Sequence, residues 1–482
     1  MNAERPLLDE PAPRKALFAN RAKVYPKIVA GRFRRLKWAA MALLLGLYYL
    51  APWLRWDRGP GSPDQAILAD IPGARLYFFF IEIWPQEVYY LTGVLILGAV
   101  GLFLATALFG RIWCGFACPQ TVWSDLYLQV ERWIEGERAE RIRLDHAPWS
   151  IAKLARKLAK HAAWLLIAAA TGGAWIFYFN DAPTLMRGLA RFQASPTVLF
   201  FIALFTATTY LLAGWVREQM CIYMCPWPRF QAAMLDEHST IVTYEAWRGE
   251  PRSPKRKTES WDQRGDCIDC RQCVQVCPTG IDIRDGQQLA CIGCGLCIDA
   301  CNDIMARIER PGDLIAFDTE ANQPARMVGQ RSALRLFRPR VLVYVALLVA
   351  VAGIMLFSLM NRSDTELTVQ RDRAPLFVAL SDGDVRNSYT VKILNKTREE
   401  RDYRLSVDGL PQARITVVGH EGEAGDLVAL PVKADAVGSF RIHIRVPRDV
   451  LAGSSTPIDL VVTPFEAAER HAASTLFLGP VP

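Results

Sequence analysis

All twelve cysteines of this 482-residue chain occur in groups, with two or three residues between neighbours. Thiols at such short, repeated spacings are typical of metal ligands in a reducing compartment. Secreted domains that depend on disulfides use scattered cysteines instead, and no cysteine here is left over for such a framework. Metal-centred chemistry is therefore the first hypothesis, and the rest of the sequence should show what positions these thiols.

The strongest motif begins at Cys267 and reads C-x2-C-x2-C-x3-C-P, and a second copy without the proline begins at Cys291. Three thiolates two residues apart can surround one face of a 4Fe–4S cubane, and in two-cluster ferredoxins the fourth ligand comes from the other run. The pattern therefore predicts two clusters. Cluster one uses Cys267, Cys270, Cys273 and Cys301, and cluster two uses Cys291, Cys294, Cys297 and Cys277. Zinc is the rival metal, but zinc sites usually pair two C-x2-C units.

The other four cysteines form two C-x3-C-P motifs, at Cys114 and Cys118 and, 107 residues later, at Cys221 and Cys225. On a helix, an i, i+4 spacing puts both sulfurs on one face, and the proline that follows fits a helix stop or restart. Four such thiolates can bind copper, because soft ligands favour Cu(I), or hold a further metal centre, or cycle as dithiols. Four buried, inert cysteines are the alternative without chemistry.

Hydrophobic residues make up 51% of the chain, and many of them are concentrated in five apolar runs. A bilayer span needs about 20 mostly apolar residues. The runs are Trp38–Leu54, Tyr90–Phe109, Ala162–Phe179, Thr197–Val216 and Val341–Met360. Aromatic residues near their ends argue against buried helices of a water-soluble protein, so we expect a membrane domain with about five spans.

Basic residues predict the orientation of these spans. Residues 1–37 hold ten Lys or Arg and residues 110–161 hold nine, whereas residues 51–89 hold three and residues 180–196 hold two. By the positive-inside rule, the N-terminus, the 110–161 loop and the 217–340 loop are cytoplasmic. The tail after Met360 is then periplasmic, in the inner membrane of a Gram-negative bacterium. The net charge of +7 is explained by these topology signals, and we expect no nucleic-acid partner.

The C-terminal tail reads as an all-β domain. Short alternating runs are separated by Gly, Pro, Asp and Asn at the spacing expected of an Ig-like sandwich. The runs are Tyr389–Leu394, Ala413–Val418, Leu427–Val432, Ser439–Val446 and Pro457–Val462. The predicted organisation is a basic tail (1–37), a four-span domain (38–236), a cytoplasmic ferredoxin-like α+β domain with linkers (237–340), a fifth span (341–360) and the sandwich (361–482).

Two weaker signals stay open. The aromatic segment from Arg75 to Pro85 contains Glu82 and is either part of a quinol or metal pocket or an interfacial segment packed on the spans. His146, His161 and His238 are cytoplasmic by this topology, and nothing in their spacing marks them as haem ligands.

With these motifs in place, the sequence resembles the cytochrome c oxidase accessory proteins of the CcoG/FixG/RdxA type. The resemblance rests on Trp113–Trp123, Cys221–Pro226, Arg229–Asp236 and Cys267–Cys301, and it extends through a single span to an Ig-like tail. It covers nearly the whole chain. The departures are small, and Trp227-Pro228 stands where a less constrained pair is expected.

The resemblance implies a membrane electron carrier that reduces Cu(II) to Cu(I) for insertion into a cbb-type oxidase. By resemblance, copper chemistry belongs to Cys114, Cys118, Cys221 and Cys225, and the partners are lipid and either oxidase subunits or copper chaperones. Two rivals remain: a quinol-linked ferredoxin relay to a periplasmic reductase, and a non-enzymatic assembly scaffold. The sequence leaves open the electron donor and whether the chain forms a homo-oligomer.

Overall fold

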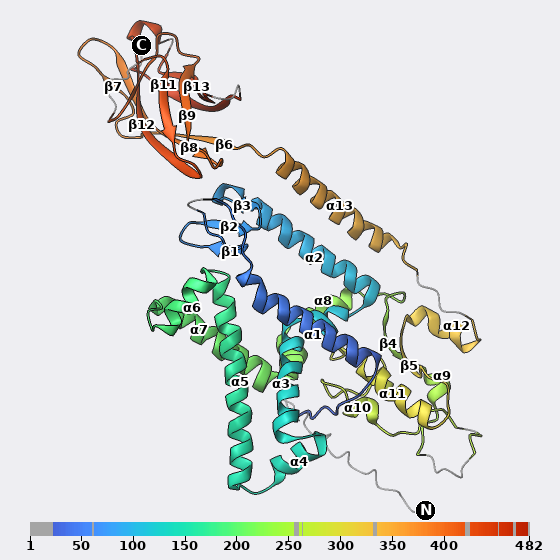
Figure 1. The fold of residues 1–482 in the computed structure, drawn as a ribbon. Helices are drawn as coiled ribbons and strands as arrows, with labels where there is room; N and C mark the ends of the chain where they lie inside the picture. Colours follow the sequence, from blue (N-terminus) through green and yellow to red (C-terminus); the bar gives the residue numbers. More distant parts are fainter. Residues whose placement is uncertain are drawn as a thin grey trace, which may run out of the picture. The chain divides into compact units, whose positions relative to one another are not determined.

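The computed structural model describes residues 23–59, 62–254, 260–262, 264–330, 335–419, 425–451, 453–465 and 469–480. Most of the predicted basic tail, residues 1–22, lies outside the described residues. The chain divides into two compact units, Met1–Met355 and Leu356–Pro482, so the division falls inside the last apolar helix. The first unit is mainly helical and the second is all β (Figure 1).

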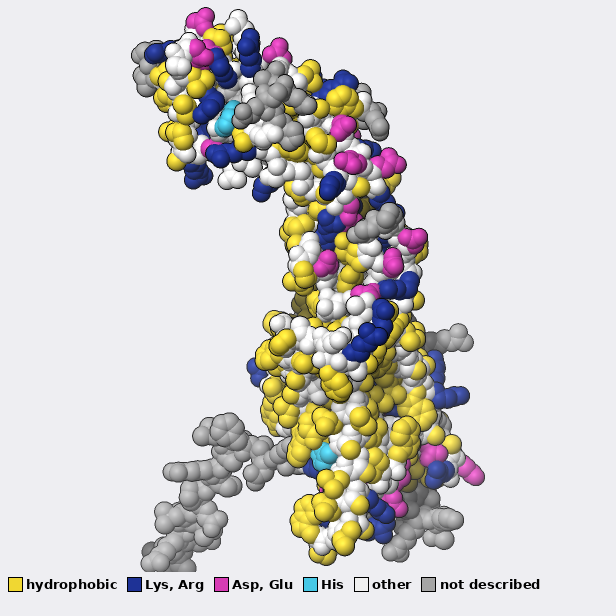
Figure 2. Space-filling view, turned by 60° about the vertical axis from the view of Figure 1, so that its left-hand side comes forward, with side chains coloured by type: hydrophobic (Ala, Val, Ile, Leu, Met, Phe, Trp, Pro, Cys, Tyr) yellow, Lys and Arg dark blue, Asp and Glu magenta, His cyan; other side chains and the backbone are white. Residues whose placement is uncertain are grey.

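Long helices dominate the first unit. They are α1 (Arg32–Leu50), α2 (Tyr89–Phe109), α3 (Pro119–Glu135), α4 (Arg138–His146), α5 (Ile151–Phe177), α6 (Ala182–Ala190), α7 (Pro196–Thr209) and α13 (Pro339–Met360). Among the described residues, four segments are long and apolar enough to cross a membrane: Arg32–Trp53, Pro85–Phe109, Pro196–Val216 and Pro339–Met360. In α13 only Val341 is buried, and α7 buries no residue, which suits helices whose apolar surface meets lipid. Hydrophobic side chains cover much of this unit's visible face in Figure 2.

The third predicted span lies in α5, which is 27 residues long but is not among those four segments. Its first three turns carry several Lys and Arg residues, so its apolar part is short. The helix nevertheless lies antiparallel to α7. A Cβ on Gly172 would come within 2.8 Å of the Thr206 amide nitrogen, and one on Gly214 within 3.0 Å of the Trp164 ring. That α5 spans the membrane stays a prediction.

The segment between α1 and α2 forms a small antiparallel sheet, β1 (Ile67–Asp70), β2 (Arg75–Phe78) and β3 (Ile81–Ile83), in that order. Arg75 pairs with Glu82 at 2.9 Å, and its guanidinium lies 3.8 Å from the centre of the Trp84 ring. Glu82 is thus held within a strand pair, and the alternative of a quinol or metal pocket gains no support there.

The ferredoxin part is compact. It contains the two-stranded antiparallel sheet of β4 (Ile241–Tyr244) and β5 (Ile315–Asp318). Helix α10 (Gln272–Gln275) lies inside the first cysteine run, and α11 (Leu296–Arg307) begins inside the second. Short helices α8 (Trp227–Met234), α9 (Ala246–Gly249) and α12 (Gln323–Met327) flank it. Its core is built from both sheet and cysteine loops, for example Val242, Ile298 and Ile315 around Cys273.

The start of α1 fastens the ferredoxin part to the membrane helices. Asp299 of α11 accepts hydrogen bonds from the backbone amides of Phe33 (3.2 Å) and Arg34 (2.8 Å), which are free donors at a helix N-terminus. The Arg34 guanidinium binds both carboxylate oxygens of Asp125 on α3, at 3.0 and 2.8 Å. This cap explains why α1 begins at Arg32, six residues before the predicted span.

The second unit is a β-sandwich. One sheet has the order β10-β12-β8-β6 with β7 beside β8, and the other has the order β11-β9-β13-β14. The strands are β6 (Thr365–Arg371), β7 (Val378–Ala379), β8 (Val385–Asn395), β9 (Arg401–Asp408), β10 (Arg414–Val417), β11 (Val428–Val432), β12 (Ala436–Val446), β13 (Ser455–Pro464) and β14 (His471–Leu478). Both sheets contribute to one apolar core, including Tyr389, Leu405 and Leu460. All five predicted runs overlap strands.

Candidate iron–sulfur and thiol sites

The eight ferredoxin cysteines form two groups in space. Cys301 lies near Cys273, Cys267 and Cys270. Burial, and after it the charges of these neighbours, raises the pKa of the Cys301 thiol to about 12. Cys297 has Cys294, Cys291 and Cys277 among its neighbours, and burial raises the pKa of its thiol well above the ordinary value. The structure thus brings together the two sets that the sequence predicts, each with one cysteine from the other run. Their role as cluster ligands stays a prediction.

Backbone conformation in the two runs is also equivalent. Asp269 and Arg271 have positive φ (50° and 53°), and so do Gly293 (66°) and Gly295 (72°), which occupy the same positions in the second run. Left-handed residues alternating with right-handed ones turn successive N–H groups into a concave nest, a form that suits anionic groups such as iron–sulfur clusters. Non-glycine residues rarely adopt this conformation, so Asp269 and Arg271 hold it because the loop requires it.

The two groups of thiols fit an iron–sulfur cluster better than a single ion. Within the described part of the chain, no set of three or more His, Cys, Asp or Glu side chains is arranged to hold one metal ion. A cubane binds each thiolate through a different iron, so its ligands surround a body instead of meeting at a point. Thiolates this deeply buried need such a cationic centre to remain charged. When bound, the clusters would supply reversible one-electron transfer.

The four remaining thiols also lie together. Burial raises the pKa of the Cys114 thiol to about 12, with further contributions from Cys118, Cys221 and Cys225. Burial, then Cys118 and Cys225, raises the pKa of the Cys221 thiol to about 12 as well. Two motifs 107 residues apart in sequence therefore form one thiol cluster, which we call the four-cysteine site. Cys114 also donates a hydrogen bond to Gln231 Oε1 at 3.2 Å.

Both C-x3-C-P motifs fold in the same way, but not as the α-helical turn expected from their spacing. They form π-helical turns, η3 (Trp113–Ala117) and η5 (Met220–Met224). The Cys118 amide bonds to the Trp113 carbonyl at 2.8 Å, and the Cys225 amide bonds to the Met220 carbonyl at 2.7 Å. A third π-helical stretch, η4 (Tyr210–Val216), precedes the second motif. Such wide turns are frequent at functional sites.

The four-cysteine site packs directly on the loop of the second cysteine run. Cys114 contacts an apolar cluster that contains Cys294, Val276 and Ile292. A Cβ on Gly115 would lie 2.8 Å from the Gly293 carbonyl oxygen, so only glycine allows this approach. Arg111 adds a tether, because its guanidinium donates hydrogen bonds to the carbonyl oxygens of Leu289 and, at 3.0 Å, Cys291.

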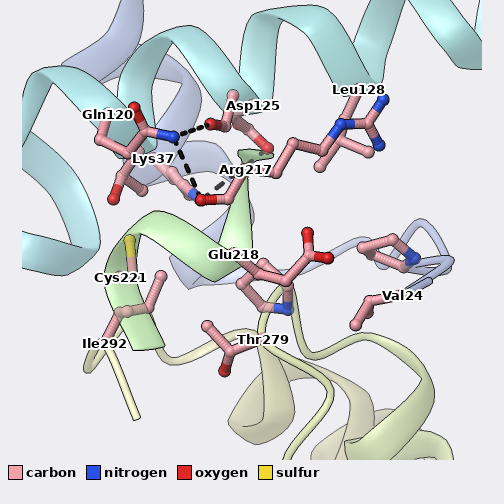
Figure 3. A pocket seen from close by; sticks show the side chains of 14 residues that line it. Val24, Lys37, Gln120, Asp125, Leu128, Arg217, Glu218, Cys221, Thr279 and Ile292 are labelled. Atoms are coloured by element: carbon pink, nitrogen blue, oxygen red, sulfur yellow. Dashed lines mark hydrogen bonds and ion pairs between the residues drawn. The ribbon is translucent and has the colours of Figure 1, made fainter. Parts of the chain in front are cut away.

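A cavity beside these contacts is lined by charged side chains. Figure 3 shows Cys221 and Glu218 on one helical segment, with Lys37, Asp125 and Arg217 above them. Thr279 and Ile292, from the two cysteine runs, line the same cavity. Asp125 is shared by Lys37, at 3.8 Å, and Arg34, so these three side chains together carry one positive charge. The cavity therefore gives polar access to Cys221 from the ferredoxin side.

Next to this cavity, Glu131 on α3 anchors a buried ionic network. It accepts hydrogen bonds from Arg217 (2.5 and 3.0 Å) and Arg141 (3.0 Å), and Lys160 lies 3.8 Å away. Burial alone would raise the pKa of Glu131, but the charge and hydrogen bonds of Arg217 outweigh it and lower the pKa to about 2. This network fixes the backbone just before the second C-x3-C-P motif.

Three known protein families match separate regions of the chain. The "4Fe-4S dicluster domain" family matches residues 216–320, a "4Fe-4S binding domain" family matches residues 91–136, and the "IG-like fold at C-terminal of FixG" family matches residues 355–480. The nitrogen fixation protein FixG of Rhizobium meliloti is 48% identical over 485 residues, covering 95% of this chain and 93% of that protein. The chain belongs to the FixG/RdxA family.

Other FixG-type proteins extend this result. RdxA and RdxB of Cereibacter sphaeroides are each 48% identical to the chain, covering 92% and 96% of it and 93% and 98% of their own lengths. A crystal structure of a FixG-related protein from Vibrio parahaemolyticus matches 25% of this chain and 99% of its own, at 22% identity and a TM-score of 0.21. The family and the apolar helices identify this FixG-type chain as a membrane iron–sulfur protein.

Several residues that shape this FixG-type site were not found from the sequence. Arg111, Gln231 and Asp299 are single polar residues in otherwise ordinary surroundings, and each acts on a partner more than 100 residues away. Glu218 lies three residues before Cys221, but an isolated acid near a membrane boundary forms no pattern that predicts a role. For Arg111 and Glu218, the sequence signal for a role at this site is that each lies close to a C-x3-C-P motif.

Proposed function

We propose that this FixG-type protein transfers electrons from two 4Fe–4S clusters to copper bound at the four-cysteine site. Each step reduces one Cu(II) to Cu(I) with one electron from a reduced cluster. The packing of Cys114 against the core that contains Cys294 supports the proposal, because it leaves no intervening domain between the two sites. Cys267, Cys270, Cys273 and Cys301 would hold one cluster and Cys291, Cys294, Cys297 and Cys277 the other.

The chemistry of the four thiols favours reduction. Soft thiolate ligands stabilise Cu(I) relative to Cu(II), and Cu(I) needs as few as two of them, so binding at a pair of thiols from Cys114, Cys118, Cys221 and Cys225 would make electron acceptance by the ion more favourable. Burial keeps the Cys114 and Cys221 thiols protonated while no cation is bound, so copper binding would release their protons. The charged cavity around Cys221 offers a route for an incoming cation.

With five spans, including α5, the proposed topology agrees with the distribution of Lys and Arg along the chain. Because α5 and α7 are antiparallel, both C-x3-C-P motifs would emerge at the cytoplasmic face of the inner membrane, beside the ferredoxin part. The sandwich would then be periplasmic. By family resemblance, we propose that the Cu(I) is destined for a cbb-type oxidase, with oxidase subunits or copper chaperones as partners.

A third 4Fe–4S cluster is a second candidate for the four-cysteine site. One observation favours it: the region 91–136, which contains Cys114 and Cys118, matches a 4Fe-4S binding family. A third cluster would make the protein a relay without a copper site. Iron and sulfide content distinguishes the two, since two clusters require about eight iron and eight sulfide per chain and three require about twelve.

Stopped-flow spectroscopy of the anaerobically purified, full-length protein tests the function. Cu(II) should reoxidise the dithionite-reduced clusters, and Cu(I) should appear in equal amount to the electrons lost. A quinol-linked relay would respond to quinol or quinone but not to Cu(II). A scaffold would show neither response, which would overturn the proposal.

A further inference from the structure

A second cavity adjoins the one that reaches Cys221, and none of its lining residues is a cysteine. Its walls include Trp149 and Leu154 before and on α5, His161 and Trp164 on α5, and Trp215 on η4. Arg217 and Glu218 line both this cavity and the one that reaches Cys221. These two residues, which lie three and four positions before Cys221, thus link the second cavity to the four-cysteine site.

Aromatic rings build the wall around His161. Its imidazole stacks on Trp215, with ring centres 5.6 Å apart and planes at 17°. It is perpendicular to Trp164, with ring centres 5.1 Å apart. The Tyr210 hydroxyl forms a 2.9 Å hydrogen bond with His161 Nδ1. Among the described residues His161 Nε2 has no hydrogen-bond partner. The ring is thus fixed in orientation with one nitrogen still available.

The cavity opens where lipid and water should meet. Trp149, Leu154 and Trp215 are 75%, 48% and 49% exposed, and the apolar part of α5 begins directly after His161. Exposed tryptophans at such a level are typical of the membrane interface. Tyr210 and Trp215 belong to the π-helix η4, a departure from regular helix of the kind that often accompanies a binding site.

We propose that this cavity binds the headgroup of a membrane quinol, which serves as the electron donor for the proposed function. Oxidation of the quinol to quinone releases two electrons and two protons. One electron would go to each of the two 4Fe–4S clusters. The protons would go to His161 Nε2 and to the Glu218 carboxylate, from which they can leave to the cytoplasmic side. The exposed ring of Trp215 would hold the flat quinol ring by stacking.

A quinol fits the cavity better than a phospholipid headgroup does. A phosphate would need unpaired cations, yet Lys157 binds Glu135 at 2.8 Å and Asp145 at 2.6 Å, and Lys160 binds Glu135 at 3.0 Å. Burial and the Lys160 charge lower the pKa of His161, which favours the neutral imidazole, the form that can accept a proton. Lys157 also lowers the pKa of His161, whereas Glu135 and Glu131 raise it.

Photolabelling of the full-length protein in lipid nanodiscs tests the site. The probe is a short-chain azidoquinone, and its labelled peptides are mapped by mass spectrometry. We expect labels on α5 near His161 and on η4. The variant His161→Gln should weaken binding roughly tenfold, the loss expected for one hydrogen bond to a bound ligand. His146→Gln, an exposed histidine on α4, is the matched control and should bind as wild type does.

Three results would overturn the proposal: labels confined to other segments, unchanged affinity in His161→Gln, or displacement of the probe by phosphatidylglycerol but not by excess unlabelled quinone. If His161→Gln loses its clusters, Tyr210→Phe replaces it, since it removes only the hydroxyl that orients the imidazole. A separate arm keeps the two proposals distinct. Dithionite-reduced His161→Gln should still be reoxidised by Cu(II) at the wild-type rate, whereas failure of that reaction in wild type would contradict the copper proposal instead.

Discussion

The Gly115 backbone lies against the Gly293 carbonyl oxygen so closely that a Cβ at position 115 would come within 2.8 Å of it. The first C-x3-C-P motif and the second cysteine run therefore touch through backbone atoms. We expect Gly115→Ala to push the two apart, at a cost of about 1–3 kcal/mol in stability, and to slow electron transfer between clusters and copper. Cluster reoxidation by Cu(II) measures the effect.

Gly98→Ala is the control for this prediction. Gly98 also lies on a helix, in α2, but a Cβ there would have open space around it. Alanine is favoured over glycine in helices, so this variant should be as stable as wild type or more so. Equal reoxidation rates in the two variants would show that the contact at Gly115 does not matter for electron transfer.

The crossing of the fourth ligands gives a second prediction. Cys277 lies with Cys291, Cys294 and Cys297, and Cys301 lies with the first three cysteines of the first run. Cys277→Ser should therefore damage the second cluster, and Cys301→Ser the first. Electron paramagnetic resonance of each reduced variant distinguishes the two clusters. Loss of the same cluster in both variants would refute the crossover.

The Glu131 network predicts a pH dependence of stability. The pKa of the Glu131 carboxyl is lowered from 4.5 to about 2. Its ion pairs therefore stabilise the folded protein fully above about pH 4.5, and this stabilisation is lost as the pH falls towards 2. Glu131→Gln leaves Arg217 and Arg141 without their buried partner and should cost about 3–5 kcal/mol near neutral pH. Denaturant unfolding should show that the gap from wild type narrows below pH 4.5.

Glu309→Gln controls for the loss of one negative charge, because Glu309 is exposed. It should unfold as wild type does at every pH. A gap between wild type and Glu131→Gln that stays constant down to pH 2 would mean that the glutamate is not held ionised by Arg217.

The sequence was most informative where ligands follow one another closely along the chain. The spacing of the eight ferredoxin cysteines predicts both spatial groups, and the alternating runs of the tail predict strands such as β8 and β12. Contacts between distant segments could not be predicted in this way. Arg34 meets Asp125 and Asp299 only because α1, α3 and α11 converge, and no local pattern encodes that convergence. The sequence predicts a cytoplasmic position for His161 but no role, since its partners Tyr210 and Trp215 lie about 50 residues away.

Topology depends on α5, the one predicted span that lies outside the four strongly apolar segments. With five spans, reporter fusions after Asp57 and after Ser363 should read periplasmic, and fusions near His146 and Pro254 should read cytoplasmic. Without α5 as a span, the readouts at Pro254 and Ser363 would be exchanged. That result would place the ferredoxin part in the periplasm and contradict the proposed topology.

The central claim is that copper bound at the four-cysteine site receives its electrons from the two ferredoxin clusters. The most direct test is the rate at which Cu(II) reoxidises the dithionite-reduced clusters in wild type and in the variant with Cys114, Cys118, Cys221 and Cys225 all changed to Ala. Both ferredoxin clusters should remain in this variant, with their paramagnetic resonance signals unchanged, while reoxidation by Cu(II) is lost. Each pair changed alone should already lose most of the rate, because the four thiols form one site. Reoxidation at the wild-type rate in the quadruple variant, with both clusters present, would contradict the claim.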